Sequence, residues 1–159
     1  VKIVDNNNNN SGWRLTGIYG EFRWENKHLT WSCMRQLLQA HTLPYLLVGD
    51  LNEIMYLHEK EGGNPRPPQY MQAFQDIVEE CALHDLGYIG DQYTWRRGRI
   101  WERLDRGLVN DLWTSQFPHA ALRWSLIIRI TDLFWWTLTS MYSHQAARIH
   151  MSKDLKLDG

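Results

Sequence analysis

Apolar positions recur along this chain with two kinds of spacing, one typical of β-strands and the other of amphipathic helices. Residues 13–19 are strand-like, and residues 1–4 read as the end of an earlier strand, with the asparagine-rich residues 6–12 forming a hairpin loop between them. Residues 45–48 are a short, wholly apolar run, which is typical of a strand buried on both faces. The run ends at Gly49-Asp50, so Asp50 is expected where a buried strand leaves the sheet.

Two longer segments have the spacing of amphipathic helices. Residues 25–40 carry apolar side chains at helical intervals, and residues 69–82 do the same after Pro67-Pro68, a pair that suits the first turn of a helix. The glycines and prolines of residues 59–68 predict an irregular surface loop before the second helix. The predicted apolar faces are Leu29, Cys33, Leu37 and Leu38 in the first helix, and Met71, Phe74, Ile77, Val78 and Cys81 in the second.

Strands dominate the later part of the chain. Residues 92–96 and 103–109 look like two strands joined by a turn around Gly98, and further strands are expected at residues 120–128 and 133–139. Asn110 suits the N-cap of a short segment at residues 111–117. Early alternation of strands and helices, followed by crowded strands, favours the α/β or α+β class with helices layered on a sheet. We expect one partial domain over residues 1–139 and a tail, residues 140–159, without a sustained pattern.

Composition narrows the class of protein. A chain of 159 residues with 43% hydrophobic residues and nine tryptophans is built to fold as about one domain. The formal net charge of −1 provides no overall attraction to a polyanion, so any nucleic-acid contact must come from a local basic patch. Arg123, Arg129 and Asp132 interrupt the most apolar stretch, residues 122–138, and make a membrane span improbable.

The remaining compositional signals concern the compartment. Cys33 and Cys81 lack the short spacing of a metal site, and free thiols are favoured over a disulfide. The first residues show no apolar core of a signal peptide. We therefore expect a soluble intracellular protein of the nucleus or cytoplasm.

The strongest local candidate for chemistry is the segment from Val48 to Glu53. Asp50 and Asn52 lie two residues apart at the exit of a buried strand, where both can bind one phosphate or metal ion from a common face. Ordinary turn chemistry is an equally good explanation, because Gly-Asp-x-Asn also suits a tight turn.

A second candidate is Arg103-Leu104-Asp105-Arg106, an acid flanked by arginines within a predicted strand. An aspartate has poor strand propensity, so it is often kept there for a reason, although a surface salt-bridge ladder would also explain it. Residues 95–101 interleave arginines with tryptophans, as a surface that contacts phosphates and bases would, or as a solvated hairpin would. The candidate nucleic-acid contacts are Arg96, Arg97, Arg99, Arg103 and Arg106.

Several motifs, taken in order, resemble one family. The chain is similar to the endonuclease-like domain of plant LINE-type (non-LTR) retrotransposons, within the endonuclease/exonuclease/phosphatase superfamily. The likeness covers roughly residues 13–138, and the order and spacing of the motifs make it specific. The motifs are Trp13-Arg14-Leu15-Thr16-Gly17-Ile18-Tyr19-Gly20, Gly49-Asp50-Leu51-Asn52-Glu53-Ile54, Glu59-Lys60-Glu61-Gly62-Gly63, Arg103-Leu104-Asp105-Arg106 and Phe117-Pro118.

The resemblance implies a four-layer α/β sandwich with a phosphodiester site at one edge of two packed sheets, where Mg²⁺ binds. In such a site Asp50 would orient or deprotonate the attacking water, Asn52 would hold the scissile phosphate, and Tyr19 would hydrogen-bond or stabilise that phosphate. Asp105 would orient a catalytic histidine, and Asp132 would be the acid near the metal in a terminal Ser-Asp-His motif.

The chain departs from this family in two ways. The terminal motif reads Thr131-Asp132-Leu133, and leucine can neither donate a hydrogen bond nor carry charge. The family's N-terminal half, with a phosphate-site asparagine and a metal-binding glutamate, has no counterpart before Val1. Because losing one positioned electrostatic donor typically costs ~10²- to 10³-fold in rate, the sequence predicts a degenerate, truncated domain that is silent or nearly so and binds Mg²⁺ weakly.

Two other functions stay open at this stage. The chain is an active Mg²⁺-dependent endonuclease if a missing N-terminal half completes it, or a nucleic-acid-binding module that uses its arginines without catalysis. DNA is the expected partner in either case. Half of a two-sheet sandwich would leave apolar sheet surface uncovered, which predicts self-association.

Overall fold

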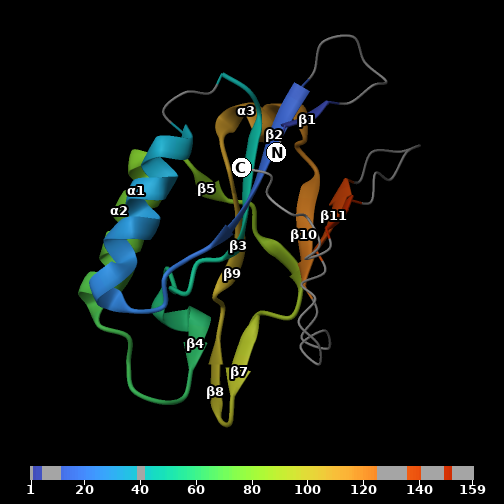
Figure 1. Ribbon diagram of the computed structural model, residues 1–159. Helices are drawn as coiled ribbons and strands as arrows, with labels where there is room; N and C mark the ends of the chain where they lie inside the picture. Colours follow the sequence, from blue (N-terminus) through green and yellow to red (C-terminus); the bar gives the residue numbers. More distant parts are fainter. Residues whose placement is uncertain (1, 5–11, 39–41, 125–135, 141–148, 152–159) are drawn as a thin grey trace.

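The computed structural model describes residues 2–4, 12–38, 42–124, 136–140 and 149–151, which form a mixed α/β structure with three sheets (Figure 1). The helical elements are η1 (Trp24–Asn26), α1 (Lys27–Leu38), η2 (Leu57–Glu59), α2 (Pro68–Glu80) and α3 (Asp111–Gln116). The strands are β1 (Lys2–Val4), β2 (Gly12–Tyr19), β3 (Tyr45–Asp50), β4 (Lys60–Glu61), β5 (His84–Asp85), β6 (Tyr88–Gly90), β7 (Trp95–Arg97), β8 (Ile100–Glu102), β9 (Asp105–Val109), β10 (Ala120–Trp124), β11 (Trp136–Ser140) and β12 (Ile149–Met151).

The largest sheet has the order β1-β2-β3-β9-β5 and runs through the middle of the molecule (Figure 1). β1 and β2 pair antiparallel, which confirms the predicted pair of strands, while their asparagine-rich loop lies outside the described residues. β3 runs parallel to β2 and antiparallel to β9, and all six of its residues are buried, as the apolar run predicted. Its last residue, Asp50, therefore lies at the end of a central strand.

Helices cover one face of this sheet and a second sheet covers the other. Tyr45 and Leu47 pack with Trp31 and Phe74 of the helices. The residues that alternate with them in β3 pack in a different cluster, with Trp113 and with Leu122 of β10. β10 belongs to the second sheet, of order β12-β11-β10-β6. The described residues thus form three layers, helices on sheet on sheet, and the fourth layer of a sandwich remains a prediction.

The predicted helices are both present, but the first one presents a different face to the core. α2 buries Met71, Phe74, Ile77 and Val78, as its spacing predicted. α1 instead buries Lys27, Thr30, Trp31 and Met34. Of the predicted apolar face, Leu37 and Leu38 pack against the core, but Leu29 is 52% exposed and Cys33 is also exposed, so the prediction was wrong for the first half of the helix. The large ring of Trp31 and the unbranched Met34 fill the space against the sheet that Leu29 and Cys33 were expected to fill.

Two predicted boundaries were also wrong. Residues 59–68 are only partly an irregular surface loop, because Glu59 is 2% exposed and β4 pairs antiparallel with β8. The turn around Gly98 joins β7 to β8 rather than to β9, and Arg103 and Leu104 connect β8 to β9. β4, β8 and β7 make up the third, small sheet at one end of the molecule (Figure 1).

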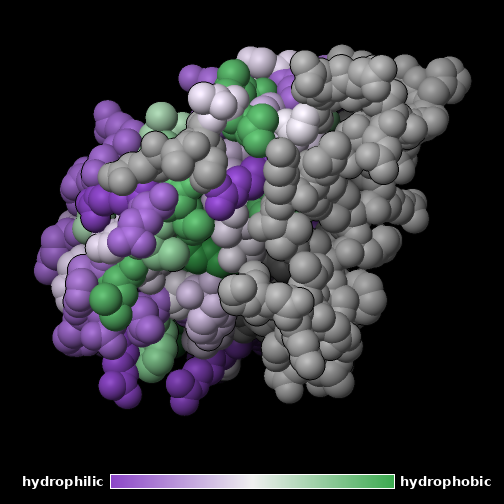
Figure 2. Space-filling model, turned by 45° about the horizontal axis from the view of Figure 1, so that its top comes forward, coloured by the Kyte–Doolittle hydropathy of each residue, from purple (hydrophilic) through white to green (hydrophobic). Residues whose placement is uncertain are grey.

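The later strands agree with the prediction where the structure describes them. β10 and β11 pair antiparallel, while residues 125–135, which include Asp132, lie outside the described residues. β12 pairs with β11 and falls in the tail for which no pattern was found. The outer surface of the helical layer is mostly hydrophilic (Figure 2). Among the described residues, no helix has the length and apolar character to cross a bilayer.

Candidate functional site

Three predicted site residues form a row across the end of the central sheet. Tyr19 pairs with Asp50 in the parallel β2–β3 ladder, and Asp50 pairs with Asp105 in the antiparallel β3–β9 ladder. Directly paired residues project from the same face of a sheet. This row therefore brings Tyr19, Asp50 and Asp105 together, although Asp50 and Asp105 are far apart in the sequence.

The face on which the row lies follows from the alternation of side chains along β2 and β3. Leu15 and Val48 have the same parity as Tyr19 and Asp50, and both pack in the cluster with Leu122 of the second sheet. The row therefore lies on the face toward the second sheet, at the end of the strands. Asp50 is 7% and Asp105 4% exposed, whereas Tyr19 is 71% exposed, so two buried carboxylates adjoin an accessible phenol.

A tight turn follows Asp50 and contains Asn52. One Asp50 carboxylate oxygen accepts a hydrogen bond from the Asn52 backbone N–H at 2.8 Å, and the Asn52 side-chain amide donates to the Gly20 carbonyl at 2.8 Å. Asn52 has a φ of 53°, a left-handed conformation that costs most residues energy but that asparagine tolerates. The turn chemistry proposed as the alternative explanation is therefore present, and it holds Asn52 beside the end of β2.

A buried lysine beneath this turn was missed in the sequence. Lys27, the first residue of α1, is 2% exposed, and its Nζ donates to the carbonyl oxygens of Leu51 and Asn52, at 2.9 Å each. Burial lowers the pKa of Lys27 to about 8, while the negative charge of Glu53 acts in the opposite direction. The signal was available, because Lys27 precedes Trp31 and Met34 by four and seven residues and so shares their helix face.

A second buried charge lies next to the turn. Glu53 is 1% exposed, and burial raises its pKa, although the nearby positive charges of Arg66 and Lys27 oppose this shift. Arg66 Nε lies 3.0 Å from Glu53 Oε1, and its Nη2 donates to Glu102 at 3.1 Å. Lys60 pairs with the same Glu102 carboxylate. These contacts tie the segment after β3 to β8.

Arg103 and Arg106 do not lie on a nucleic-acid-contacting surface, contrary to the prediction. Arg106 is 0% and Arg103 6% exposed, and their guanidinium groups form four ion pairs with Glu59 and Asp85 at 2.6 to 2.9 Å. Arg106 also lies over the ring of Phe74, on the helical face of the sheet. Both arginines belong to a buried ion-pair network. Because Glu59 and Asp85 already neutralise their charges, neither arginine is available to contact a phosphate at the surface.

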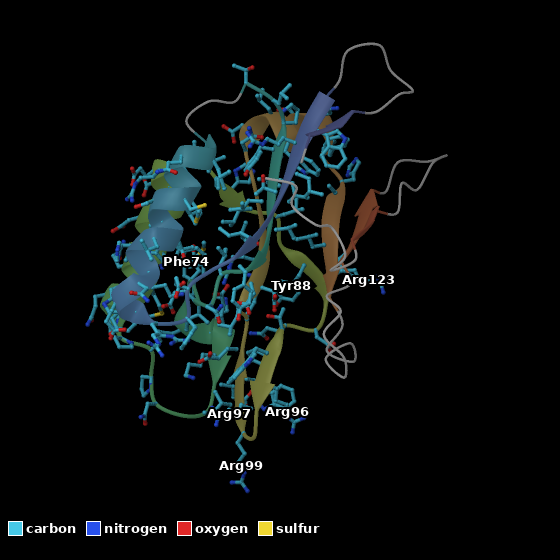
Figure 3. All side chains as sticks on the ribbon, in the orientation of Figure 1. Phe74, Tyr88, Arg96, Arg97, Arg99 and Arg123 are labelled. Atoms are coloured by element: carbon cyan, nitrogen blue, oxygen red, sulfur yellow. The ribbon has the colours of Figure 1, made fainter. Side chains whose placement is uncertain are left out.

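The other three predicted arginines are exposed. Arg96, Arg97 and Arg99 project from the β7–β8 hairpin, at the end of the molecule where the small sheet lies (Figure 3). The Arg96 guanidinium lies 4.0 Å from the centre of the Trp101 ring, a cation–π contact. Arg103 and Leu104 connect the hairpin to the start of β9, which carries Asp105.

The predicted metal ligand cannot be placed, because Asp132 lies outside the described residues. Within the described part of the chain, no group of three or more histidine, cysteine, aspartate or glutamate side chains is arranged to hold a metal ion. The row offers two carboxylates for such an ion, those of Asp50 and Asp105.

Neither a protein-family model nor a curated protein sequence matches the chain. A crystal structure of an endonuclease/exonuclease/phosphatase family protein from Bacteroides thetaiotaomicron is similar, with a TM-score of 0.36 and 14% identity. The likeness covers 89% of this chain and 46% of that protein, so the chain spans less than half of its length. A TM-score this low does not assign the chain to that family.

Proposed function

We propose that this chain carries part of the phosphodiester site of an endonuclease/exonuclease/phosphatase domain derived from a plant LINE-type retrotransposon, and that this copy is catalytically silent or nearly so. The observation that carries the proposal is the row of Tyr19, Asp50 and Asp105 at one end of the central sheet. The sequence motifs support it, because the motifs that supply these three residues also occur in the order of that family.

Each residue of the row has a chemical role in this proposal. The Asp50 carboxylate oxygens accept hydrogen bonds and can orient an attacking water, while the phenol of Tyr19 donates to a phosphate oxygen. Asn52 holds that phosphate from the adjacent turn. Asp105 would orient a histidine, but Leu133 stands where the motif has one. Charge that develops on the phosphate therefore lacks the histidine donor, which costs about 10²- to 10³-fold in rate.

Magnesium fits the described residues only in part. Mg²⁺ takes oxygen ligands and is usually bound by one or two carboxylates together with phosphate oxygens and water. Asp50 and Asp105 are paired carboxylates, and a cation between them would offset the repulsion of like charges on opposed strand positions. We propose weak Mg²⁺ binding at this pair, where the ion would neutralise charge on a bound phosphate.

A nicking assay tests the catalytic part of the proposal. Pure protein is incubated with supercoiled plasmid and Mg²⁺, and we expect no nicking above that of an Asp50→Ala variant. Nicking that disappears in Asp50→Ala would refute the silent state and favour an active Mg²⁺-dependent endonuclease. Nicking that persists in the variant identifies a contaminating nuclease.

A second experiment tests the site rather than the rate. Mn²⁺ broadens backbone NMR signals close to its binding position, so a titration of the labelled protein maps where a divalent cation binds. We expect broadening at the ends of β2 and β3 and the start of β9, and its loss in Asp50→Asn and Asp105→Asn. Asp91→Asn, which changes an exposed aspartate, is the matched control. Equal broadening in all three variants would contradict the proposed site.

A nucleic-acid-binding module is the second candidate, and the exposed hairpin favours it. Each phosphate that an arginine neutralises adds about 0.9 to the slope of log affinity against log salt concentration on duplex DNA. If Arg96, Arg97 and Arg99 contact DNA, replacing all three by glutamine lowers that slope by about 2 to 3. The same replacement at Arg23 and Arg123, which are also exposed, is the control. Equal losses in both variants would mean that binding is not specific to the hairpin.

A further part of the proposal concerns assembly. A four-layer sandwich would place another layer over the second sheet, and we propose that the protein self-associates through the face of that sheet if this face is uncovered. Sedimentation velocity over a range of concentrations measures this directly, and a monomer at all concentrations would contradict it.

A further inference from the structure

Lys27 occupies a position that is unfavourable for a lysine in three respects. It is 2% exposed, so its ammonium group has lost most of its water. It is the first residue of α1, where the helix dipole repels positive charge. The positive charge of Arg66 is also close enough to lower its pKa. A residue that is unfavourable in burial, helix position and charge environment at once is expected where a functional site constrains the sequence.

The contacts of Lys27 show what offsets these costs. Its Nζ donates to two consecutive carbonyl oxygens, those of Leu51 and Asn52, at 2.9 Å each. The charges of Glu53, Asp50 and Glu21 also favour the protonated amine. Apart from Asp50, the last residue of β3, these groups belong to the two loops that leave the sheet after β2 and β3. The lysine thus acts on the two loops beside the row of Tyr19, Asp50 and Asp105.

The turn held by Lys27 is one that needs support. Asn52 has a φ of 53°, and such a conformation persists only where surrounding contacts determine it. The carbonyls of Leu51 and Asn52 point to the helical side of the sheet, where Lys27 meets them. Thr30, one turn further along α1, accepts a hydrogen bond from the Glu21 N–H at 2.9 Å. One face of α1 therefore contacts both loops.

We propose that Lys27 is a positioning residue whose ammonium group holds the Leu51 and Asn52 carbonyls and so fixes the turn that presents Asp50 and Asn52. The proposal rests on the proposed function only in identifying that turn as part of the site. The competing explanation is that Asn52 fixes its own conformation, through its bonds to Asp50 and Gly20. The two explanations differ in what happens when the lysine alone is changed.

Replacement of the amine by an apolar group of similar length separates them. In Lys27→Met we expect the backbone carbon shifts of Leu51 and Asn52 to change and the Asn52 amide to exchange at least tenfold faster, while the amides of α2 keep their protection. Lys27→Arg keeps a charged donor and is expected to restore much of the wild-type spectrum. Arg35→Met, on the exposed side of the same helix, is the matched control and should leave the turn unchanged. An unaltered Asn52 in Lys27→Met would overturn the proposal, as would an equal loss of protection throughout the domain.

A titration of the wild-type protein keeps the test decisive should Lys27→Met fail to fold. The Lys27 Cε signal and the carbonyl carbons of Leu51 and Asn52 are followed together from pH 6 to pH 10. We expect all three to change with one midpoint near the pKa of about 8 that burial gives Lys27. Recording Cε assigns the change to this amine rather than to Glu53, Arg66, Asp50 or Glu21, which also act on it. Carbonyl signals that stay constant while Cε titrates would refute the proposal.

Failure of this inference can be told from failure of the proposed function. The Mn²⁺ titration of Lys27→Met reports the cation site, whereas the carbon shifts report the turn. A turn that depends on Lys27 in a protein that binds no Mn²⁺ supports the positioning role and removes the phosphodiester site. Mn²⁺ binding at Asp50, together with carbon shifts of the turn that do not change in Lys27→Met, supports the phosphodiester site and removes the positioning role.

Discussion

The charge network beneath the central sheet gives the sharpest prediction for stability. Glu59 is 2% exposed, and its carboxylate accepts hydrogen bonds from the backbone N–H groups of Met55 and Tyr56 and from the guanidinium groups of Arg103 and Arg106. In Glu59→Gln the shape of the side chain is kept, but the negative charge and one accepting atom are lost. The new amide N–H groups then face other donors.

The size of the effect follows from burial. Replacing a whole buried ion pair by apolar groups is often neutral, but removing one partner leaves the other charge buried and costs about 3–5 kcal/mol. Asp85 still accepts from both arginines, so we expect the lower end, about 3 kcal/mol. For a chain of this length that corresponds to a loss of about 6–12 °C in melting temperature. Domains of this kind have about 5–15 kcal/mol in total, so the variant should fold but with little reserve.

Urea unfolding at pH 7, followed by tryptophan fluorescence and circular dichroism, measures this loss. The matched control is Glu80→Gln, since Glu80 also pairs with an arginine through both carboxylate oxygens, but on the surface of the helices. The side chains of Arg35 and Glu80 are 41% and 52% exposed, and exposed pairs contribute little, so no clear change is expected there. If Glu59→Gln unfolds at the same urea concentration as Glu80→Gln, the argument from burial is wrong.

Three further predictions concern the same fold. Arginine charges hold the pKa of Glu59 and Asp85 below their ordinary values despite burial. The stability that these carboxylates add is therefore present above about pH 4.5 and is lost as the pH falls further. Unfolding measured at a series of acidic pH values should show a smaller loss of stability in Glu59→Gln than in wild type. Asn110→Ala should cost about 2 kcal/mol by urea unfolding, because Oδ1 of Asn110 caps α3 through Trp113 N–H and also accepts from Tyr45 N–H, and a cost near zero would contradict the cap. Gly49→Ala should prevent folding or cost about 4 kcal/mol, since a Cβ there would lie 1.8 Å from the Ile18 carbonyl oxygen. Gly17→Ala should be tolerated, because a Cβ at Gly17 would have nothing within 4 Å. Equal stability of the two variants would contradict the pairing of β2 with β3.

The sequence predicted most elements of the fold because their patterns are local. The apolar run of β3, the helix of α2 and the cap at Asn110 each depend on a few neighbouring residues. The predicted face of α1 was right for Leu37 and Leu38 and wrong for Leu29 and Cys33, because the larger side chains of Trp31 and Met34 fill the space against the sheet in the first half of the helix. The extra strands β4 and β8 were missed because they depend on pairing between distant segments.

The candidate site was predictable where strands end and unpredictable where charges are buried. Asp50 and Asp105 lie in register because motifs at strand ends meet at one edge of a sheet. Arg103 and Arg106 looked like surface cations because charged residues are rarely buried unless they are paired, and their partners Glu59 and Asp85 are far away in the sequence. Lys27 was overlooked for the same reason, since a lysine early in a helix is ordinarily a solvated residue.

The carboxylates of the row and the buried arginines lie on opposite faces of the central sheet. This arrangement bears on whether catalytic groups could be lost from such a protein while it remains folded. Asp105 faces the second sheet, whereas Arg106, its neighbour in β9, lies over Phe74 on the helical face. The groups that brace the loops, namely Glu59, Arg106 and Lys27, therefore make no use of the side of the sheet where a histidine would act. If the proposed function holds, leucine at position 133 removes a catalytic donor but none of these three buried charges, so selection for folding would not oppose it. If the proposed function holds, substitutions should be tolerated at Tyr19, which is 71% exposed, sooner than at Arg106 or Lys27, because the loss of either buried cation leaves buried partners unsatisfied.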